Sequence, residues 1–148
     1  MPTPFESAQL NIQLFDLRRE PTLRKARDWF LTEFHPASFD EYMKEMLGEK
    51  NSWIRMVVGY WDMAASMVVQ GAISQESFVA AHTEIIGTFA KVQPYLTELR
   101  GRIGPAVAAN IEQVVMAIPD AEAEMEARRK RLRARWEAQQ ATKAGFIA

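Results

Sequence analysis

The sequence predicts an all-α protein, a multi-helix bundle of six or seven segments around one central apolar helix. Apolar residues recur three or four positions apart along most of the chain, and helix-capping residues precede several of these runs. No run alternates apolar and polar residues as a half-buried strand does. The 148 residues fit one domain, which we divide into a bundle (residues 1–119) and a charged helical C-terminal extension (residues 120–148) of the same domain.

Residues 51–71 form the predicted central helix, because they are apolar on almost every side. The polar side chains of Arg55, Asp62, Ser66 and Gln70 fall on one edge of that helix. An acid at the centre of a membrane span costs roughly 2.5–3.5 kcal/mol, so Asp62 argues against a transmembrane segment. We therefore expect a buried helix of a bundle.

Three helices are predicted before this central helix. A T-x-x-E capping box at Thr3 begins the first, which runs to about Arg19 and whose apolar residues should contact neighbours on two sides. Pro21 opens the second, and Ser38 caps a short third helix. Asn51 is the predicted cap of the central helix.

After Gly71, which should end the central helix, Ser74 is the predicted cap of the next one. One apolar stripe over residues 78–92 predicts a continuous helix up to Pro94. A short piece over residues 95–102 and a helix beginning at Gly104-Pro105 should complete the bundle.

Charge and composition favour no class of partner. The net charge is −1, and the absence of cysteine excludes a disulfide framework and a thiolate zinc site. The N-terminus lacks the basic and apolar regions of a secretory signal, so we expect a cytoplasmic protein.

Familiar catalytic motifs do not occur. The sequence contains no G-x-G dinucleotide loop, no P-loop and no nucleophile elbow, and neither histidine belongs to an E-x-x-H motif. We therefore expect no cofactor and no metal, and the missing motifs lean away from an enzyme.

Asp62 is the most interesting candidate site residue, because an isolated buried carboxylate is costly. It could belong to a polar pocket that binds a small molecule or carries out a reaction, with Arg55, Tyr60, His82 and Arg100. The alternative, which we favour, is a structural ion pair that fixes the helix in place. His82 lies on an apolar stripe, where we expect a carboxylate or carbonyl to pair with its ring.

A basic cluster follows in the C-terminal extension. Its members are Arg128, Arg129, Lys130, Arg131, Arg133 and Arg135. Such a cluster could bind nucleic acid or an anionic surface. It is short, however, and belongs to a nearly neutral protein, so we do not expect nucleic acid and favour a solvated helix that packs on its own domain or on a second subunit.

Several residues resemble an uncharacterised bacterial all-helical family, a domain of unknown function, over about residues 8–115. The resemblance rests on Tyr60-Trp61-Asp62, on the turn that contains Gly71 and Ser74, on Phe78, and on Pro94-Tyr95 with Arg100. In the family that the chain resembles, Glu often stands at the position of Asp62, which weakens a role that needs a precise carboxylate reach. The resemblance implies no reaction, cofactor or partner.

The leading hypothesis is a non-enzymatic protein-interaction domain, working as a homo-oligomer, with a dimer favoured, or with another protein. The alternatives are the small-molecule binder or enzyme with a pocket around Asp62, and binding of nucleic acid or an anionic surface through Arg128–Arg135.

Overall fold

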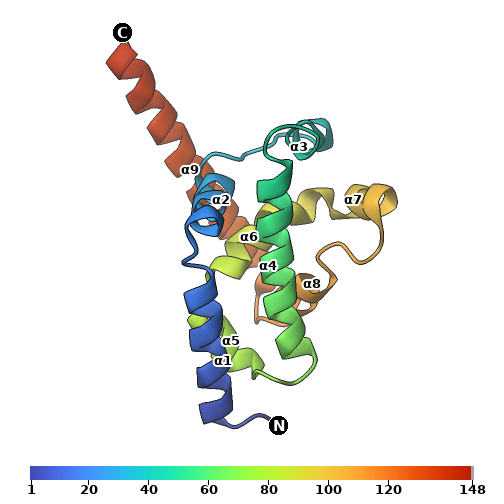
Figure 1. Ribbon diagram of the computed structural model, residues 1–148. Coiled ribbons are helices and arrows are strands. Elements are labelled where there is room, and N and C mark those ends of the chain that lie inside the picture. The colour runs from blue at the N-terminus through green and yellow to red at the C-terminus, as the bar shows by residue number, and fades with distance from the viewer. Residues whose placement is uncertain (148) are drawn as a thin grey trace.

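The computed structural model describes residues 1–147 and confirms the predicted all-α bundle (Figure 1). Within those residues no strand is present. In chain order the elements are α1 (Pro4–Leu17), α2 (Pro21–Thr32), α3 (Phe39–Met46), α4 (Asn51–Val69), α5 (Gln75–Ala81), α6 (Glu84–Val92), the 3₁₀ turn η1 (Gln93–Tyr95), α7 (Leu96–Ile103), α8 (Ala109–Met116) and α9 (Ala121–Ile147).

Helix α4 occupies the centre of the bundle, as predicted, and packs between α2 and α8 (Figure 1). Ile54, Val57 and Trp61 are at most 1 % exposed, and so are Ala64 and Ala65. Buried apolar side chains of this size each stabilise the fold by roughly 1.5–3 kcal/mol. The apolar side chains of α4 therefore explain why α2 and α8 pack against it.

Most predicted caps are present, with one exception. Thr3 makes the complete capping box with Glu6, while Ser38 and Ser74 cap α3 and α5. Asn51 does not cap α4; its side-chain amide instead donates a hydrogen bond to the Met46 carbonyl at 2.6 Å. Gly71, at φ 81°, reverses the chain after α4.

Two predicted helix boundaries were wrong. The stripe over residues 78–92 is divided between α5 and α6, because His82 leaves helical geometry at φ −132° and ψ 55°. The helix expected from Gly104-Pro105 begins only at Ala109. Positive φ angles at Gly104 (139°) and Ala108 (52°) prevent the earlier residues from joining it.

Helix α1 buries a face that carries two polar residues, while several of its apolar residues stay exposed. Its buried residues are Ser7, Asn11 and Leu14, and the Asn11 amide donates to the Ser77 hydroxyl at 2.9 Å. Phe5 and Ile12 are each 70 % exposed. The prediction that its apolar residues contact neighbours on two sides was therefore wrong.

Helix α9 packs against α6, α2 and α8 and then projects away from the bundle, so that its far end lies opposite the N-terminus (Figure 1). Met125 is fully buried, and the Arg129 guanidinium donates from Nε to the Ala90 carbonyl at 2.8 Å. These contacts hold the first half of α9 against the bundle and set the direction of its arginines.

Candidate functional site

A strongly charged hollow lies where α9 crosses α2 and the start of α6. It consists of two adjoining cavities, of about 250 and 830 Å³, which share Leu31, Glu84, Leu132 and Arg135. We refer to both together as the α2–α9 cleft. Its basic lining residues are Arg19, Arg24, Lys25, Arg27, Arg128, Arg131 and Arg135.

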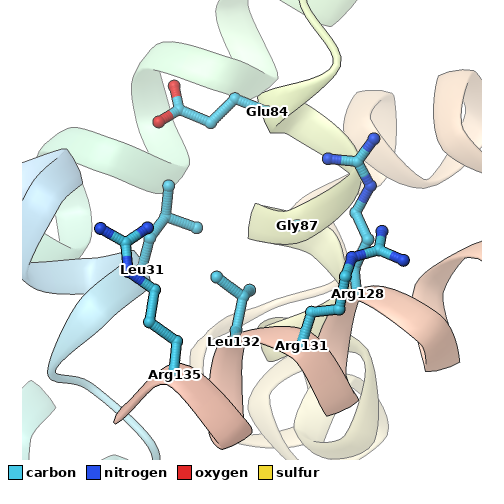
Figure 2. Close-up of a pocket in the computed structure, with 7 residues that line it drawn as sticks. All are labelled: Leu31, Glu84, Gly87, Arg128, Arg131, Leu132 and Arg135. Atoms are coloured by element: carbon cyan, nitrogen blue, oxygen red, sulfur yellow. The ribbon is translucent and has the colours of Figure 1, made fainter. Parts of the chain in front are cut away.

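Helix geometry explains how α9 supplies three of these cations. Arg128, Arg131 and Arg135 are spaced three and four apart, so they share one face of α9 with Leu132. Figure 2 shows all three arginines on α9, with Arg135 on the side of Leu31, Arg128 and Arg131 on the other side of Leu132, and Glu84 across the cavity. Gly87 of α6 also lines the cavity, where its missing side chain leaves space between Leu31 and Leu132.

Two acids line the cleft, Asp28 and Glu84, and Glu84 is already paired. Glu84 accepts from Arg18 at 3.2 Å and from Arg27 at 2.9 Å, and the side chains of all three are at most 20 % exposed. One carboxylate is thus shared between two guanidinium groups. Glu84 cannot also neutralise the arginines of α9.

The remaining cations of the cleft have no such partner among the described residues. Arg24, Lys25, Arg128, Arg131 and Arg135 make no ion pair there. The Nε atom of Arg128 is buried and has no hydrogen-bond acceptor. A buried donor without an acceptor costs roughly 1–3 kcal/mol, so Arg128 favours an anionic group that would accept from its Nε atom. The other four cations are exposed and available to the same group.

Asp62 has a structural contact that the sequence did not predict. Its carboxylate accepts from the backbone N–H groups of Asn110 and Ile111 at 3.0 and 3.1 Å, and from the Asn110 side-chain amide at 3.0 Å. Since Ala108 provides no side-chain cap, Asp62 caps α8 from a different helix. No ion pair of Asp62 is found among the described residues.

The other candidates of the proposed polar pocket do not converge on Asp62. Only Arg55 shares a hollow with it, a largely apolar space of about 300 Å³ bounded by α4, α7 and the segment before α8. The Tyr60 hydroxyl donates to the Leu14 carbonyl, which ties α1 to α4. Arg100 pairs with Glu112 at 3.1 Å and donates to the Val107 carbonyl.

His82 is buried, with its ring centroid 5.9 Å from that of Trp61 and 5.0 Å from that of Phe78. Neither ring nitrogen has a hydrogen-bond partner, so the expected carboxylate or carbonyl was wrong. Burial, with a smaller effect of the Arg18 charge, lowers the pKa of His82 from 6.5 to about 4. The neutral ring acts as part of the aromatic core.

The six members of the basic cluster point in different directions. Arg128, Arg131 and Arg135 line the α2–α9 cleft. Arg129 instead bonds to Ala90 and Gln93, Arg133 lines a smaller hollow, and Lys130 is exposed. The sequence did not identify Arg24, Lys25 and Arg27 as site residues. Their clustering can be seen in the sequence, but their position close to α9 cannot.

Neither a metal site nor a membrane-spanning helix is found in the part of the chain that the structure describes. No group of three or more His, Cys, Asp or Glu side chains there is arranged to hold a metal ion. None of the described helices combines the length and the apolar character needed to cross a membrane.

The fold and the cleft together define a small all-helical domain with a cation-lined groove. The chain belongs to the family described as Domain of unknown function (DUF4760), whose model matches residues 4–117. This confirms the resemblance to an uncharacterised family. No curated protein and no solved structure matches the chain.

The cap that Asp62 provides gives a first prediction. Asp62→Ala should lower the free energy of unfolding by about 1–2 kcal/mol, because α8 loses the acceptor of its first N–H groups. Asp62→Asn should lower it less, since an amide oxygen can still accept. Urea denaturation measures both changes, and Asp16→Ala, which removes an exposed acid of α1, should change stability by less than about 0.5 kcal/mol. Equal effects of Asp62→Ala and Asp16→Ala would contradict the cap.

The lowered pKa of His82 gives a second prediction, which concerns stability at low pH. The unfolded chain protonates this histidine below pH 6.5, whereas the folded protein resists protonation down to about pH 4. The contribution of neutral His82 to the free energy of unfolding is therefore complete above pH 6.5. It is lost as the pH falls, and the free energy of unfolding is lower by about 2 kcal/mol at pH 5. His82→Phe should flatten the dependence of unfolding free energy on pH between 7 and 5. His35, whose pKa is also lowered to about 4, should leave a residual slope in the variant. An unchanged slope would contradict a neutral His82.

Proposed function

We propose that the domain is a binding module for a phosphorylated small molecule, which it takes in the α2–α9 cleft. The observation that carries this proposal is the set of five cations without ion-pair partners, gathered from α2 and α9 around one hollow. A ligand with several phosphate charges matches them better than a single carboxylate does, because guanidinium groups bind phosphate oxygens in pairs.

The shape of the cleft supports a compact ligand more than a polymer. Its cations come from two crossing helices and face a cavity, whereas a nucleic-acid surface presents them along an extended stripe. Leu31 and Leu132 add an apolar patch inside the cavity. A small phosphorylated ligand and a sequence without cysteine also fit our proposal of a bacterial cytoplasmic protein.

Calorimetric titration with inorganic phosphate, tripolyphosphate and ATP tests the proposal. Affinity should increase from phosphate to tripolyphosphate as more cations are engaged. The double variant Arg131→Gln/Arg135→Gln should bind tripolyphosphate at least about tenfold more weakly, because charge-assisted hydrogen bonds contribute about 1.5–3 kcal/mol each.

The matched control is Lys130→Gln/Lys143→Gln, which removes the same charge from exposed positions of α9 outside the cleft. Its affinity should stay within about twofold of the wild type. Equal losses in the two double variants would mean that net charge alone attracts the anion, which would overturn the cleft as the site.

Gly87→Ala separates binding from folding. The new methyl group would lie 3.6 Å from Leu31 Cδ2 and 3.7 Å from Leu132 Cδ1, which are ordinary contacts. Alanine also favours a helix over glycine by about 1 kcal/mol. We therefore expect unchanged or higher stability together with weaker tripolyphosphate binding.

A second function, self-association, is favoured by the outer face of α1. Phe5, Ala8, Ile12 and Phe15 are spaced three and four apart and all are exposed; we call them the α1 stripe. In an antiparallel pairing of two copies, Phe5 would lie opposite Phe15 of the second copy and Ala8 opposite Ile12. The stripe complements itself, with a small residue facing a large one, as an isologous dimer requires.

The size of the α1 stripe sets the expected strength of this dimer. Its aromatic and aliphatic side chains offer roughly 400 Å² per chain, about half of what each partner buries in a stable complex. The dimer should therefore form only at high concentration. Sedimentation at increasing concentration should show a shift toward dimer that Ile12→Ser abolishes and that Gln13→Ser, on the neighbouring exposed position, preserves. A monomer at every concentration would contradict this function.

A further inference from the structure

Lys91 of α6 is buried in a way that its surroundings do not compensate. Only 7 % of the residue is exposed, and it is the one buried lysine of the six in the sequence, all of which the structure describes. No carboxylate lies within ion-pair distance of it among the described residues. Buried lysines normally have such a partner.

The hydrogen bonds around Lys91 instead favour a neutral amine. Its Nζ lies 3.1 Å from Nδ1 of His35, and Nε2 of His35 lies 3.3 Å from the Thr32 carbonyl. The second contact places the ring proton on Nε2, so Nδ1 is left as an acceptor for a Lys91 N–H. Burial, strengthened by the charge of Arg133, lowers the pKa of Lys91 to about 7.

A small hollow of about 110 Å³ opens beside this amine. Arg129 and Arg133 of α9 line it, together with His35 and Tyr95. Arg129 is held by Gln93, Glu126 and the Ala90 carbonyl, whereas Arg133 has no ion pair among the described residues. The hollow therefore combines a nucleophilic amine with a free positive charge and accepts only a small reactant.

We propose that Lys91 is a carbamylation site, at which its amine reacts reversibly with carbon dioxide. The nitrogen lone pair forms a bond to the carbon of CO₂, and one C=O π pair moves to oxygen. The nitrogen then loses a proton, for which His35 Nδ1 is the adjacent acceptor on the way to water. The products are one carbamate anion and one proton, and no oxidant or reductant is needed.

The surroundings favour the product over the free amine. Conversion replaces the neutral amine by an anion beside the positive charge of Arg133, and the free amine lacks that attraction. The charged and titratable groups that face the site are His35 from the segment after α2, Tyr95 from η1, and Arg129 and Arg133 from α9. Since Arg133 and Lys91 lie on different helices, the carbamate should also strengthen the packing of α9 on α6.

Carbon-13 NMR of the whole chain with ¹³C-labelled bicarbonate tests this site, with alkyl trapping by a trialkyloxonium salt and peptide mass spectrometry to locate the adduct. We expect one carbamate signal, absent in Lys91→Met, and a trapped adduct on Lys91 but not on the exposed Lys44 or Lys130. At a fixed pressure of CO₂, occupancy should increase from pH 6 to pH 8 as the amine loses its proton.

Arg133→Gln serves as the second variant, because it keeps the amine and removes the compensating charge. Its carbamate occupancy should fall several-fold, whereas Lys130→Gln should leave occupancy unchanged. In the wild type, bicarbonate should raise the melting temperature above that in chloride of equal ionic strength, and Lys91→Met should lose this rise. No adduct at pH 8 under saturating CO₂, or equal adducts on all lysines, would overturn the proposal.

Discussion

The burial of a wide apolar face of α4 is the constraint on which the rest of the structure depends. A helix with Trp61, Ala64 and Ala65 fully buried needs neighbours against that face, and α2 and α8 provide them. The half-buried charge of Asp62 is tolerated because its carboxylate faces the start of α8. The carboxylate meets the partial positive charge of a helix end there, which satisfies it without a cation.

Cations in this protein occur in two contrasting environments. On the side of α1, Arg18 and Arg27 enclose Glu84 and leave little charge unbalanced. On the side of α9, Arg131 and Arg135 are exposed and retain their charge. Water solvates the guanidinium groups of Arg131 and Arg135, so they need no carboxylate partner and are available to an external anion. Lys91 lacks both solvent and a carboxylate, which leaves loss of its proton as the least costly response.

Local chemistry predicted much of this fold. Capping at Thr3, Ser38 and Ser74 depends on neighbouring residues alone. The sequence of α4 by itself shows apolar residues around most of the helix. Contacts between distant segments were not predictable in the same way. The cap of α8 comes from Asp62, 48 residues earlier than Asn110, and the polar inner face of α1 is defined by Ser77. Only the α9 half of the candidate cleft was predicted from the sequence. The arginines of α9 form a cluster along the chain, but no local pattern indicates that Arg24 and Lys25 lie beside them.

Helix α9 has two parts with different physical support. Residues up to Trp136 are held by the bundle, where the Trp136 ring lies 5.2 Å from that of His35. Residues 137–147 project beyond it and end near the 88 % exposed Phe146. Eleven residues alone are too few to hold a stable helix in water. The projecting part therefore inherits its helical order from the docked part, which serves as a ready-made nucleus. Anything that loosens the docked turns from α6 should unwind the far end as well. A change in the packing of the bundle is therefore felt about 16 Å away, which is the length of the projecting part at 1.5 Å per residue.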